Sequence, residues 1–303
     1  MNTSLPCVCV LLAVHNGEKY LREAVESVLA QTLADFKFLI IDDGSTDASP
    51  QILRQFAAAD SRVQLVTQPN AGLTRTLNRG LKLAETEFIA RMDSDDVCLP
   101  TRLEAQVAFL REHADVSLVG SSVEFIDPEG CPIGPKPGLL MEHQQIDADL
   151  LQKGWPIVHP AVMVRTNAVM AIGGYDETYL TNQDHDLFLR LAEHGRMANL
   201  PQTLLKYRQH FDSISLSKSA QQVETVEAIL RAAYQRRGLA APEGLLAQRP
   251  KPMSRLDHHR AWCWAALANG NIQTARKHAW AALRLSPASQ ESWRMVYCAL
   301  RGR

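Results

Sequence analysis

Short apolar runs alternate with amphipathic segments over roughly the first hundred residues of this chain, and this alternation limits the folds available to it. The apolar runs, which predict buried strands, lie at 7–14, 36–41, 63–66 and 88–92. The segments between them place Leu, Val and Ile at helical spacing. Helices between successive strands predict an α/β fold whose mainly parallel sheet is covered on both faces.

Polar residues follow three of these predicted strands, at 15–18, 42–47 and 93–96. In an open α/β sheet, ligands bind beyond the carboxyl ends of the parallel strands. Each cluster taken alone would be an ordinary loop. Because all three are expected at the same edge of one sheet, we predict that they form a single site there.

The third cluster, Asp93-Ser94-Asp95-Asp96, places three carboxylates within four residues. Carboxylates repel one another, so such a group at the end of a strand is costly without a cation. Their hard oxygen atoms suit Mg²⁺ or Mn²⁺, which often take further ligands from substrate phosphates. An isolated Asp-x-Asp motif is also typical of a solvated turn or a helix N-terminus. The neighbouring clusters are what favour the metal here.

Composition excludes several classes of function. The chain has 303 residues, a formal net charge of −1 and no basic block, which argues against nucleic acid as a partner. Its six cysteines are scattered without zinc-ligand spacing, as expected for reduced thiols in a cytoplasmic protein. The apolar run at 5–14 is short and no Lys or Arg precedes it, so we expect neither a signal peptide nor a membrane span. A peripheral membrane contact needs no such segment and is compatible with the sequence.

The C-terminal part of the chain is expected to be helical from about residue 217, with a Pro-bearing linker at 241–252. Two helices are expected around the turn Asn269-Gly270-Asn271, and they resemble one tetratricopeptide unit or, equally, a plain helical hairpin. One such unit cannot bury its own apolar face, so it should pack on the catalytic domain or on a second copy of the chain as a homo-oligomer. We do not expect it to carry chemistry.

Several motifs between residues 7 and 216 occur in the order known from one enzyme family. They are Val14-His15-Asn16-Gly17-Glu18, Ile40-Ile41-Asp42-Asp43-Gly44-Ser45-Thr46-Asp47, Asn70-Ala71-Gly72-Leu73, Ala90-Arg91-Met92-Asp93-Ser94-Asp95-Asp96, Gly173-Gly174-Tyr175-Asp176, Asp184-His185-Asp186-Leu187 and Tyr207-Arg208-Gln209-His210. Together they resemble the family 2 glycosyltransferases of the GT-A fold. The resemblance implies a catalytic domain at 1–216, followed by a helical region at 217–303. It also implies transfer of a sugar, with inversion, from a nucleotide diphosphate sugar, most often a UDP-sugar.

The resemblance also implies which residues bind the donor. Asp42 or Asp43 would accept a hydrogen bond from the base, and Asp93 would hold the ribose or the sugar. Glu18 is equally suited to the first turn of the following helix, and Arg75 is equally suited to an exposed helix surface. The full set of expected nucleotide-binding residues is Ala13, His15, Glu18, Asp42, Asp43, Asn70, Arg75, Asp93 and Ser94.

The metal ligands implied by the resemblance are Asp95 and His210, which would bind Mn²⁺ or Mg²⁺ beside the diphosphate. The matching general base is Asp184, at the start of a predicted helix. Gln183 precedes it where the family often has Glu, a departure that removes a neighbouring charge and leaves Asp184 the best acid in register, with Asp186 as the alternative base. His159 is expected to be a packed structural residue.

Two other functions stay open on the sequence alone. A sugar-phosphate nucleotidyltransferase would need a Gly-rich basic loop after the first strand, which residues 15–18 do not supply. A non-catalytic scaffold would not need the carboxylates. The Gln-x-x-Arg-Trp signature of processive synthases is absent from the sequence, which favours single additions to a glycan or lipid-linked glycan acceptor in cell-surface polysaccharide biosynthesis. The expected location is cytoplasmic, with contact to the inner face of the membrane compatible with it.

Overall fold

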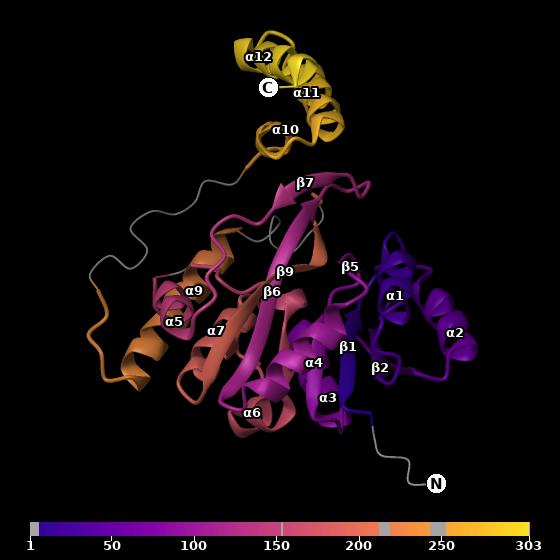
Figure 1. Ribbon diagram of the computed structural model, residues 1–303, viewed down its shortest axis with the longest axis vertical. Helices are drawn as coiled ribbons and strands as arrows, with labels where there is room; N and C mark the ends of the chain where they lie inside the picture. The colour runs from indigo at the N-terminus through magenta and orange to yellow at the C-terminus, as the bar shows by residue number, and fades with distance from the viewer. Residues whose placement is uncertain (1–5, 153, 212–218, 243–252, 303) are drawn as a thin grey trace.

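The structure is a computed structural model of the chain, which describes residues 6–152, 154–211, 219–242 and 253–302. In these ranges the strands form one nine-stranded mixed sheet in the order β3-β2-β1-β4-β8-β6-β9-β5, with β7 paired to β6 (Figure 1). The strands are β1 (Val8–Val14), β2 (Lys37–Asp43), β3 (Val63–Gln68), β4 (Phe88–Met92), β5 (Val97–Cys98), β6 (Val116–Ile126), β7 (Pro132–Pro135), β8 (Met163–Arg165) and β9 (Arg196–Arg208).

Helices connect and cover these strands. They are α1 (Leu21–Leu29), α2 (Ser49–Ala59), α3 (Leu73–Leu83), α4 (Arg102–Glu112), α5 (His143–Leu151), α6 (Thr166–Ala171), α7 (Gln183–Ala192), α9 (Ser219–Arg236), α10 (Arg255–Ala268), α11 (Ile272–Leu285) and α12 (Gln290–Arg301), with a short 3₁₀ turn at His159–Ala161. This α/β arrangement confirms the fold class predicted from the alternation of strands and helices.

Alternating side chains of the central strands fill two separate cores. Val8, Val10 and Leu12 of β1 point to the face covered by α1, α2 and α4. Cys9 and Leu11 point to the opposite face, which α3, α5, α7 and α9 cover. Both faces are apolar because parallel strands are buried on both sides, which is why β1 reads as a continuous apolar run.

Strand direction determines which loops meet. β1, β2, β3 and β4 are parallel to one another. β8 is antiparallel both to β4 and to β6, and β9 is parallel to β6. β6 and β9 therefore run in the same direction as β4, and the segments that follow all three strands leave from one edge of the sheet. This carboxyl edge carries the candidate site.

Pairing in the second half of the sheet is irregular in places. β6 runs without a break from Val116 to Ile126, although its pairing with β9 shifts register on both sides of Ser122. The Pro- and Gly-rich stretch that follows β6 contains β7, which pairs with it. In the first half of the chain, α2 begins at Ser49, whose backbone N–H donates to Asp47 at 2.9 Å.

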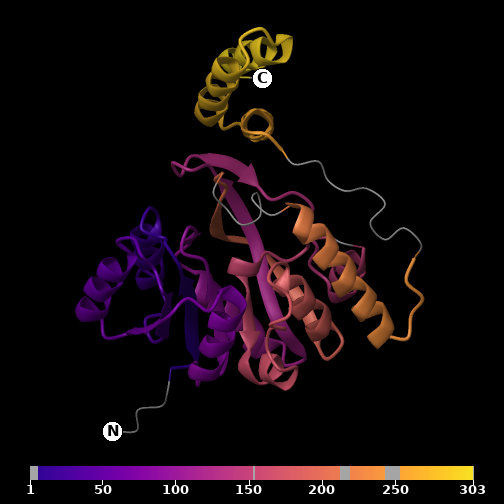
Figure 2. The same cartoon turned by 180° about the vertical axis from the view of Figure 1, so that it is seen from behind.

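The C-terminal helices divide into two groups. The apolar side chains of α9 belong to the core under α5 and α7. Helices α10, α11 and α12 share a small core of their own, and α12 was not expected from the sequence. Figures 1 and 2 show α10–α12 beyond β7, at one end of the molecule. Most of the expected linker lies outside the described residues, and the domain boundary near 216 and the tetratricopeptide likeness stay predictions.

Candidate active site

Three carboxylates gather where β4 ends. Asp93, Asp95 and Asp96 each place an oxygen within 4.8 Å of the others, the only such group of potential metal ligands found among the described residues. β4 stops at Met92, and the chain then turns through these residues before the short strand β5. The acidic cluster that the sequence predicted at a strand end is therefore present in the fold.

The electrostatics of this cluster fit a divalent cation. Burial raises the pKa of Asp93, and the negative charge of Asp95 raises it further. Burial likewise raises the pKa of Asp96, with further contributions from Asp95 and Asp93. One carboxylate oxygen of Asp96, Oδ2, is buried without a hydrogen-bond partner. Since a cation would relieve the repulsion and these oxygens are the ligands Mg²⁺ and Mn²⁺ prefer, the residues suit either ion.

His210 directs a ring nitrogen at this cluster. Its Nε2 lies 2.9 Å from Oδ2 of Asp95, and its imidazole is mostly buried beside the ring of Tyr20. His210 follows β9, which ends at the same edge of the sheet as β4. The two residues predicted as metal ligands are therefore neighbours.

A second group of predicted residues surrounds the end of β2. Both carboxylate oxygens of Asp43 accept backbone hydrogen bonds, from Ala71 at 2.8 Å and from Gly72 at 2.9 Å. His15 Nδ1 lies 2.9 Å from the carbonyl oxygen of Asp43, and the Asn70 amide nitrogen lies 3.2 Å from the His15 ring. The loops after β1, β2 and β3 thus meet around Asp43.

The carboxylate of Asp43 is held in its charged form by these contacts. Burial alone would raise its pKa, but hydrogen bonds from Gln68, Ala71, Thr76 and Gly72 outweigh burial and lower it. Asp42 is also buried, and it accepts a single backbone hydrogen bond from Ser45 at 3.1 Å. Asp42 therefore retains more acceptor capacity for a ligand than Asp43 does.

The remaining nucleotide candidates are distributed around these loops. Ala13 lies on β1 beside Ile41. Ser94 packs against the loop after β1, since a Cβ on Gly17 would lie 3.1 Å from the Ser94 hydroxyl. Glu18 accepts a hydrogen bond from the backbone of Ala48 at 2.8 Å, just before α2.

Arg75 stands apart from the other candidates. Its side chain is exposed and forms its ion pair with Glu177, at 3.3 Å. This contact links α3 to the segment that follows α6 rather than to the carboxylates of the site. The structure gives Arg75 the surface position that the sequence left open as its alternative.

The two candidate bases on α7 have different surroundings. Asp186 is buried and its Oδ2 lies 2.6 Å from Arg190, one turn further along the helix. Burial raises the pKa of Asp184. The positive charge of Arg91 partly opposes this increase, and the negative charge of Asp93 adds to it. Asp184 is therefore in electrostatic reach of the acidic cluster, whereas Asp186 is engaged with its own helix.

Sequence reasoning did not assign a role to Arg91, whose buried guanidinium forms an ion pair with Asp93. An arginine inside an apolar run, one residue before the end of the strand, was the available signal. His159, expected as a packed residue, is buried and its Nε2 lies 2.7 Å from the hydroxyl of Tyr175.

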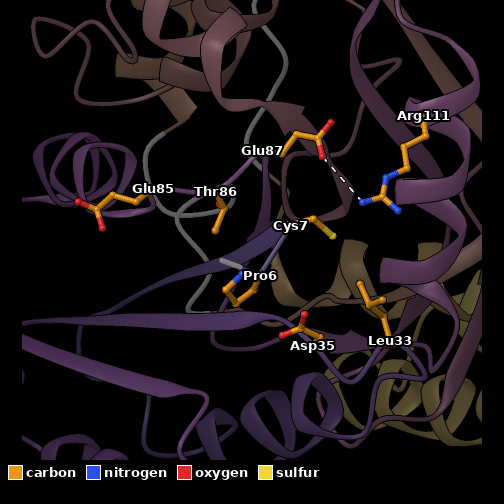
Figure 3. A pocket seen from close by; sticks show the side chains of 8 residues that line it. All are labelled: Pro6, Cys7, Leu33, Asp35, Glu85, Thr86, Glu87 and Arg111. Atoms are coloured by element: carbon orange, nitrogen blue, oxygen red, sulfur yellow. Dashed lines mark ion pairs between the residues drawn. The ribbon is translucent and has the colours of Figure 1, made fainter. Parts of the chain in front are cut away.

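A hollow of about 530 Å³ lies away from these residues, among Pro6, Cys7, Leu33, Asp35, Glu85, Thr86, Glu87 and Arg111 (Figure 3). Cys7 and Glu87 precede β1 and β4, so this hollow lies at the amino edge of the sheet, opposite the acidic cluster. Its polar contact is a long ion pair of 3.9 Å between Glu87 and Arg111. The hollow takes no part in the site at the carboxyl edge.

The sequence is similar to known proteins over about two thirds of its length. The model of a family described as Glycosyl transferase family 2 matches residues 9–172. The "Putative glycosyltransferase EpsE" of Bacillus subtilis (strain 168) is 35% identical over 219 residues, covering 69% of this chain and 75% of that protein. The chain belongs to glycosyl transferase family 2. The "O-antigen biosynthesis glycosyltransferase WbnJ" of Escherichia coli is 33% identical over 221 residues, covering 71% of this chain and 85% of that protein.

Solved structures share the GT-A fold with this family 2 member. S. aureus TarS 1–349 in complex with UDP-GlcNAc has a TM-score of 0.59 at 17% identity, covering 98% of this chain and 92% of that one. The mannosyltransferase PcManGT from Pyrobaculum calidifontis, in complex with GDP-Man and Mn²⁺, has a TM-score of 0.57 at 18% identity. The match covers 99% of this chain and 81% of that one. At these identities the likeness establishes the fold alone.

The family assignment decides between the functions that the sequence left open. The protein is a glycosyltransferase that takes its sugar from a nucleotide sugar, and not a nucleotidyltransferase or a scaffold without activity. In the described part of the chain, no helix combines the length and apolar character needed to cross a membrane.

Proposed function

We propose that this family 2 glycosyltransferase moves a sugar from a UDP-sugar to a hydroxyl of a glycan or lipid-linked glycan, with inversion at the anomeric carbon and with Mn²⁺ or Mg²⁺ bound. The observation that carries the proposal is the meeting of Asp95 and His210 at the carboxyl edge of the sheet, with Asp184 near the same cluster. Relatives named for O-antigen and amylovoran biosynthesis support an acceptor in cell-surface polysaccharide.

The donor would lie across the loops after β1, β2 and β4. Asp42 retains a free acceptor for the N–H edge of a base, and Asp43 fixes the loop that carries Asn70. His15, Glu18 and Ser94 would line the same path toward the acidic cluster, as would the backbone at Ala13. The UDP-GlcNAc complex of TarS supports uracil as the base of the donor, whereas PcManGT was solved with a guanine nucleotide. The identity of the base should therefore be tested first.

The diphosphate end would be held at the acidic cluster. Asp95 and His210 would ligate the cation, with Asp93 placed toward the ribose or the sugar by its ion pair with Arg91. A bound divalent ion would supply positive charge that stabilises the departing nucleoside diphosphate. Asp93 and Asp96 would then ionise more readily, because the positive charge of the cation would oppose the burial and the repulsion that raise the pKa of each.

Asp184 would remove the proton from the acceptor hydroxyl. The hydroxyl attacks from the face opposite the leaving nucleotide, so one base is sufficient and the configuration inverts. A retaining reaction of the covalent type would need a second carboxylate as nucleophile. Asp186, the nearest other carboxylate on α7, is engaged with Arg190.

A screen of UDP-, GDP- and dTDP-sugars for release of nucleoside diphosphate, with Mn²⁺, Mg²⁺ or chelator, tests this function. We expect metal-dependent release from a UDP-sugar, and a β-linked product from an α-linked donor by the anomeric coupling in NMR. An α-linked product, or undiminished release in excess chelator, would overturn the proposal. We place the reaction on the cytoplasmic side, with a lipid-linked acceptor presented at the inner face of the membrane.

A further inference from the structure

The turn after β6 is one of the places where helices α10–α12 contact the catalytic domain. The side chain of Asp127 in this turn is fully buried, and its Oδ2 lies 2.5 Å from Nζ of Lys277 and 3.2 Å from Nε2 of His278. Its Oδ1 accepts hydrogen bonds from the backbone of Glu129 and Cys131. Burial would raise the pKa of Asp127, but its bonds to His278 and Lys277 outweigh burial and lower it. A charged carboxylate therefore fixes α11 to this turn.

The other side of the same turn contacts Arg208, the last residue of β9. Nη1 of Arg208 lies 3.4 Å and 3.3 Å from the carbonyl oxygens of Asp127 and Pro128. Nε donates to the carbonyl oxygen of Asp95 at 2.8 Å, and the backbone N–H donates to Oδ1 of Asp96 at 2.8 Å. Arg208 thus joins the turn that α11 holds to the loop that carries the acidic cluster.

Arg208 is also restrained from a third direction. Its Nη2 lies 2.6 Å from a carboxylate oxygen of Glu23 on α1, and its guanidinium lies 4.5 Å from the ring centre of Tyr20. The side chain is only 2% exposed. Little free space surrounds the Arg208 side chain. Any movement of the β6–β7 turn would therefore displace Arg208 and change its bonds to Asp95 and Asp96.

A second contact reaches the residues on both sides of His210. The indole N–H of Trp262 on α10 donates to the side-chain oxygen of Gln209 at 2.5 Å. The rings of Trp262 and Phe211 have their centres 5.3 Å apart. β9 ends at Arg208, and beyond it Gln209 keeps one backbone bond to Ile126. Docking of α10 therefore restrains the segment on which His210 lies.

We propose that Trp262 and Lys277 are positioning residues for the metal and diphosphate site, and that docking of α10 and α11 holds His210 and Arg208 in register with Asp95 and Asp96. This inference rests on the proposed function, because it assigns a purpose to the same site. It agrees with the expectation that the C-terminal helices carry no chemistry. They contribute no reacting group, but they fix those that do.

The test uses the full chain with Trp262→Phe and Lys277→Met combined. The matched control is Trp280→Phe with Arg284→Met, which makes the same kinds of change at exposed positions of α11. Titration calorimetry measures Mn²⁺ binding in the presence of UDP, and hydrogen exchange follows the amides of 93–98 and 204–211. Loss of partners that orient metal ligands typically costs 10–100-fold in affinity, so we expect Mn²⁺ binding to weaken by about tenfold or more. Exchange should also quicken in both segments, and the control should match the wild type.

The outcomes separate the inference from the function on which it rests. Wild-type Mn²⁺ affinity and exchange in the double variant would overturn the inference and leave the proposed function intact. If the wild type binds no metal but exchange still quickens in the variant, the metal assignment fails and the positioning role stands. As a single substitution, Lys277→Arg keeps a donor for Asp127, so this variant should bind Mn²⁺ as the wild type does. If the double variant does not fold, Trp262→Phe alone keeps an aromatic ring in place and answers the same question.

Discussion

The imidazole Nε2 of His210 and the carboxylate Oδ2 of Asp95 lie 2.9 Å apart, although 115 positions separate them in the sequence. They meet because β4 and β9 run in the same direction, so the segments after both strands leave from one edge of the sheet. The pairing brings an imidazole nitrogen to a cluster of hard oxygen ligands. It is the geometric basis of the metal site proposed here.

Replacement of Asp95 by Asn should abolish most of the transfer activity. The carboxamide keeps the shape of the side chain but lacks the charge that would hold a divalent cation. Loss of the electrostatic stabilisation that such a site supplies should lower kcat by at least about 100-fold. Steady-state rates with saturating Mn²⁺ provide the measurement, and an unchanged far-UV circular dichroism spectrum controls for folding. A near wild-type kcat in the Asp95→Asn enzyme would rule out Asp95 as a metal ligand.

Replacement of Asp184 by Asn should remove the base and leave donor binding intact. Loss of a general base typically lowers the rate by about 10²–10⁴-fold. Asp186→Asn is the matched control, because it makes the same change two residues away on α7. It breaks the buried pair with Arg190 and should lower the free energy of unfolding by about 2 kcal/mol. Its transfer rate per folded molecule should stay near that of the wild type. Equal loss of transfer in both variants would contradict the assignment of Asp184.

The raised pKa of Asp184 predicts how rate and stability depend on pH. Because the base must be ionised, kcat/KM should begin to fall, as pH is lowered, at a pH above the ordinary value of 3.8 for an aspartate. The fold binds this proton more tightly than the unfolded chain does, so ionisation of Asp184 destabilises the protein above its folded pKa and not below 3.8.

The Asp184→Asn variant should therefore melt at a higher temperature than the wild type at neutral pH, and the difference should disappear in acid. Differential scanning calorimetry across this range gives the measurement. A variant that is destabilised at neutral pH would show that burial does not disfavour the charged form of Asp184.

Replacement of Asp43 by Ala should weaken nucleotide binding and destabilise the fold. The backbone N–H groups of Ala71 and Gly72 would lose their acceptor, at a cost of about 1–3 kcal/mol. Because the pKa of Asp43 is lowered in the fold, its contribution to stability is complete above 3.8 and is lost as pH falls through the folded pKa. Urea unfolding at neutral and acid pH should show a loss in Asp43→Ala that shrinks in acid. A pH-independent difference would contradict the charge effect.

The sequence alone was sufficient to predict the parallel core of the sheet and the location of the acidic cluster. Val8, Val10 and Leu12 alternate with Cys9 and Leu11 on β1, and both sets are apolar because both faces of a parallel strand are covered. The carboxylates follow the apolar run of β4 directly, so their place at a strand end could be derived from neighbouring residues. These features depend on local patterns, which a sequence displays without any knowledge of distant contacts.

Only the tertiary structure shows how residues far apart in the sequence are arranged around the acidic cluster. Asp184 and Asp186 have the same chemistry at the start of α7, but their surroundings depend on how that helix packs. The charges of Arg91 and Asp93 act on Asp184, whereas Asp186 pairs with Arg190. The motif Tyr207-Arg208-Gln209-His210 did not by itself give Arg208 a role, and Trp262 belongs to no motif. Their contacts arise because β6 and β9 end at the same edge of the sheet as β4 and because α10 docks on the segment that follows β9. Contacts of this kind are set by strand direction and helix packing, which join residues far apart in the chain and leave no periodic signal in the sequence.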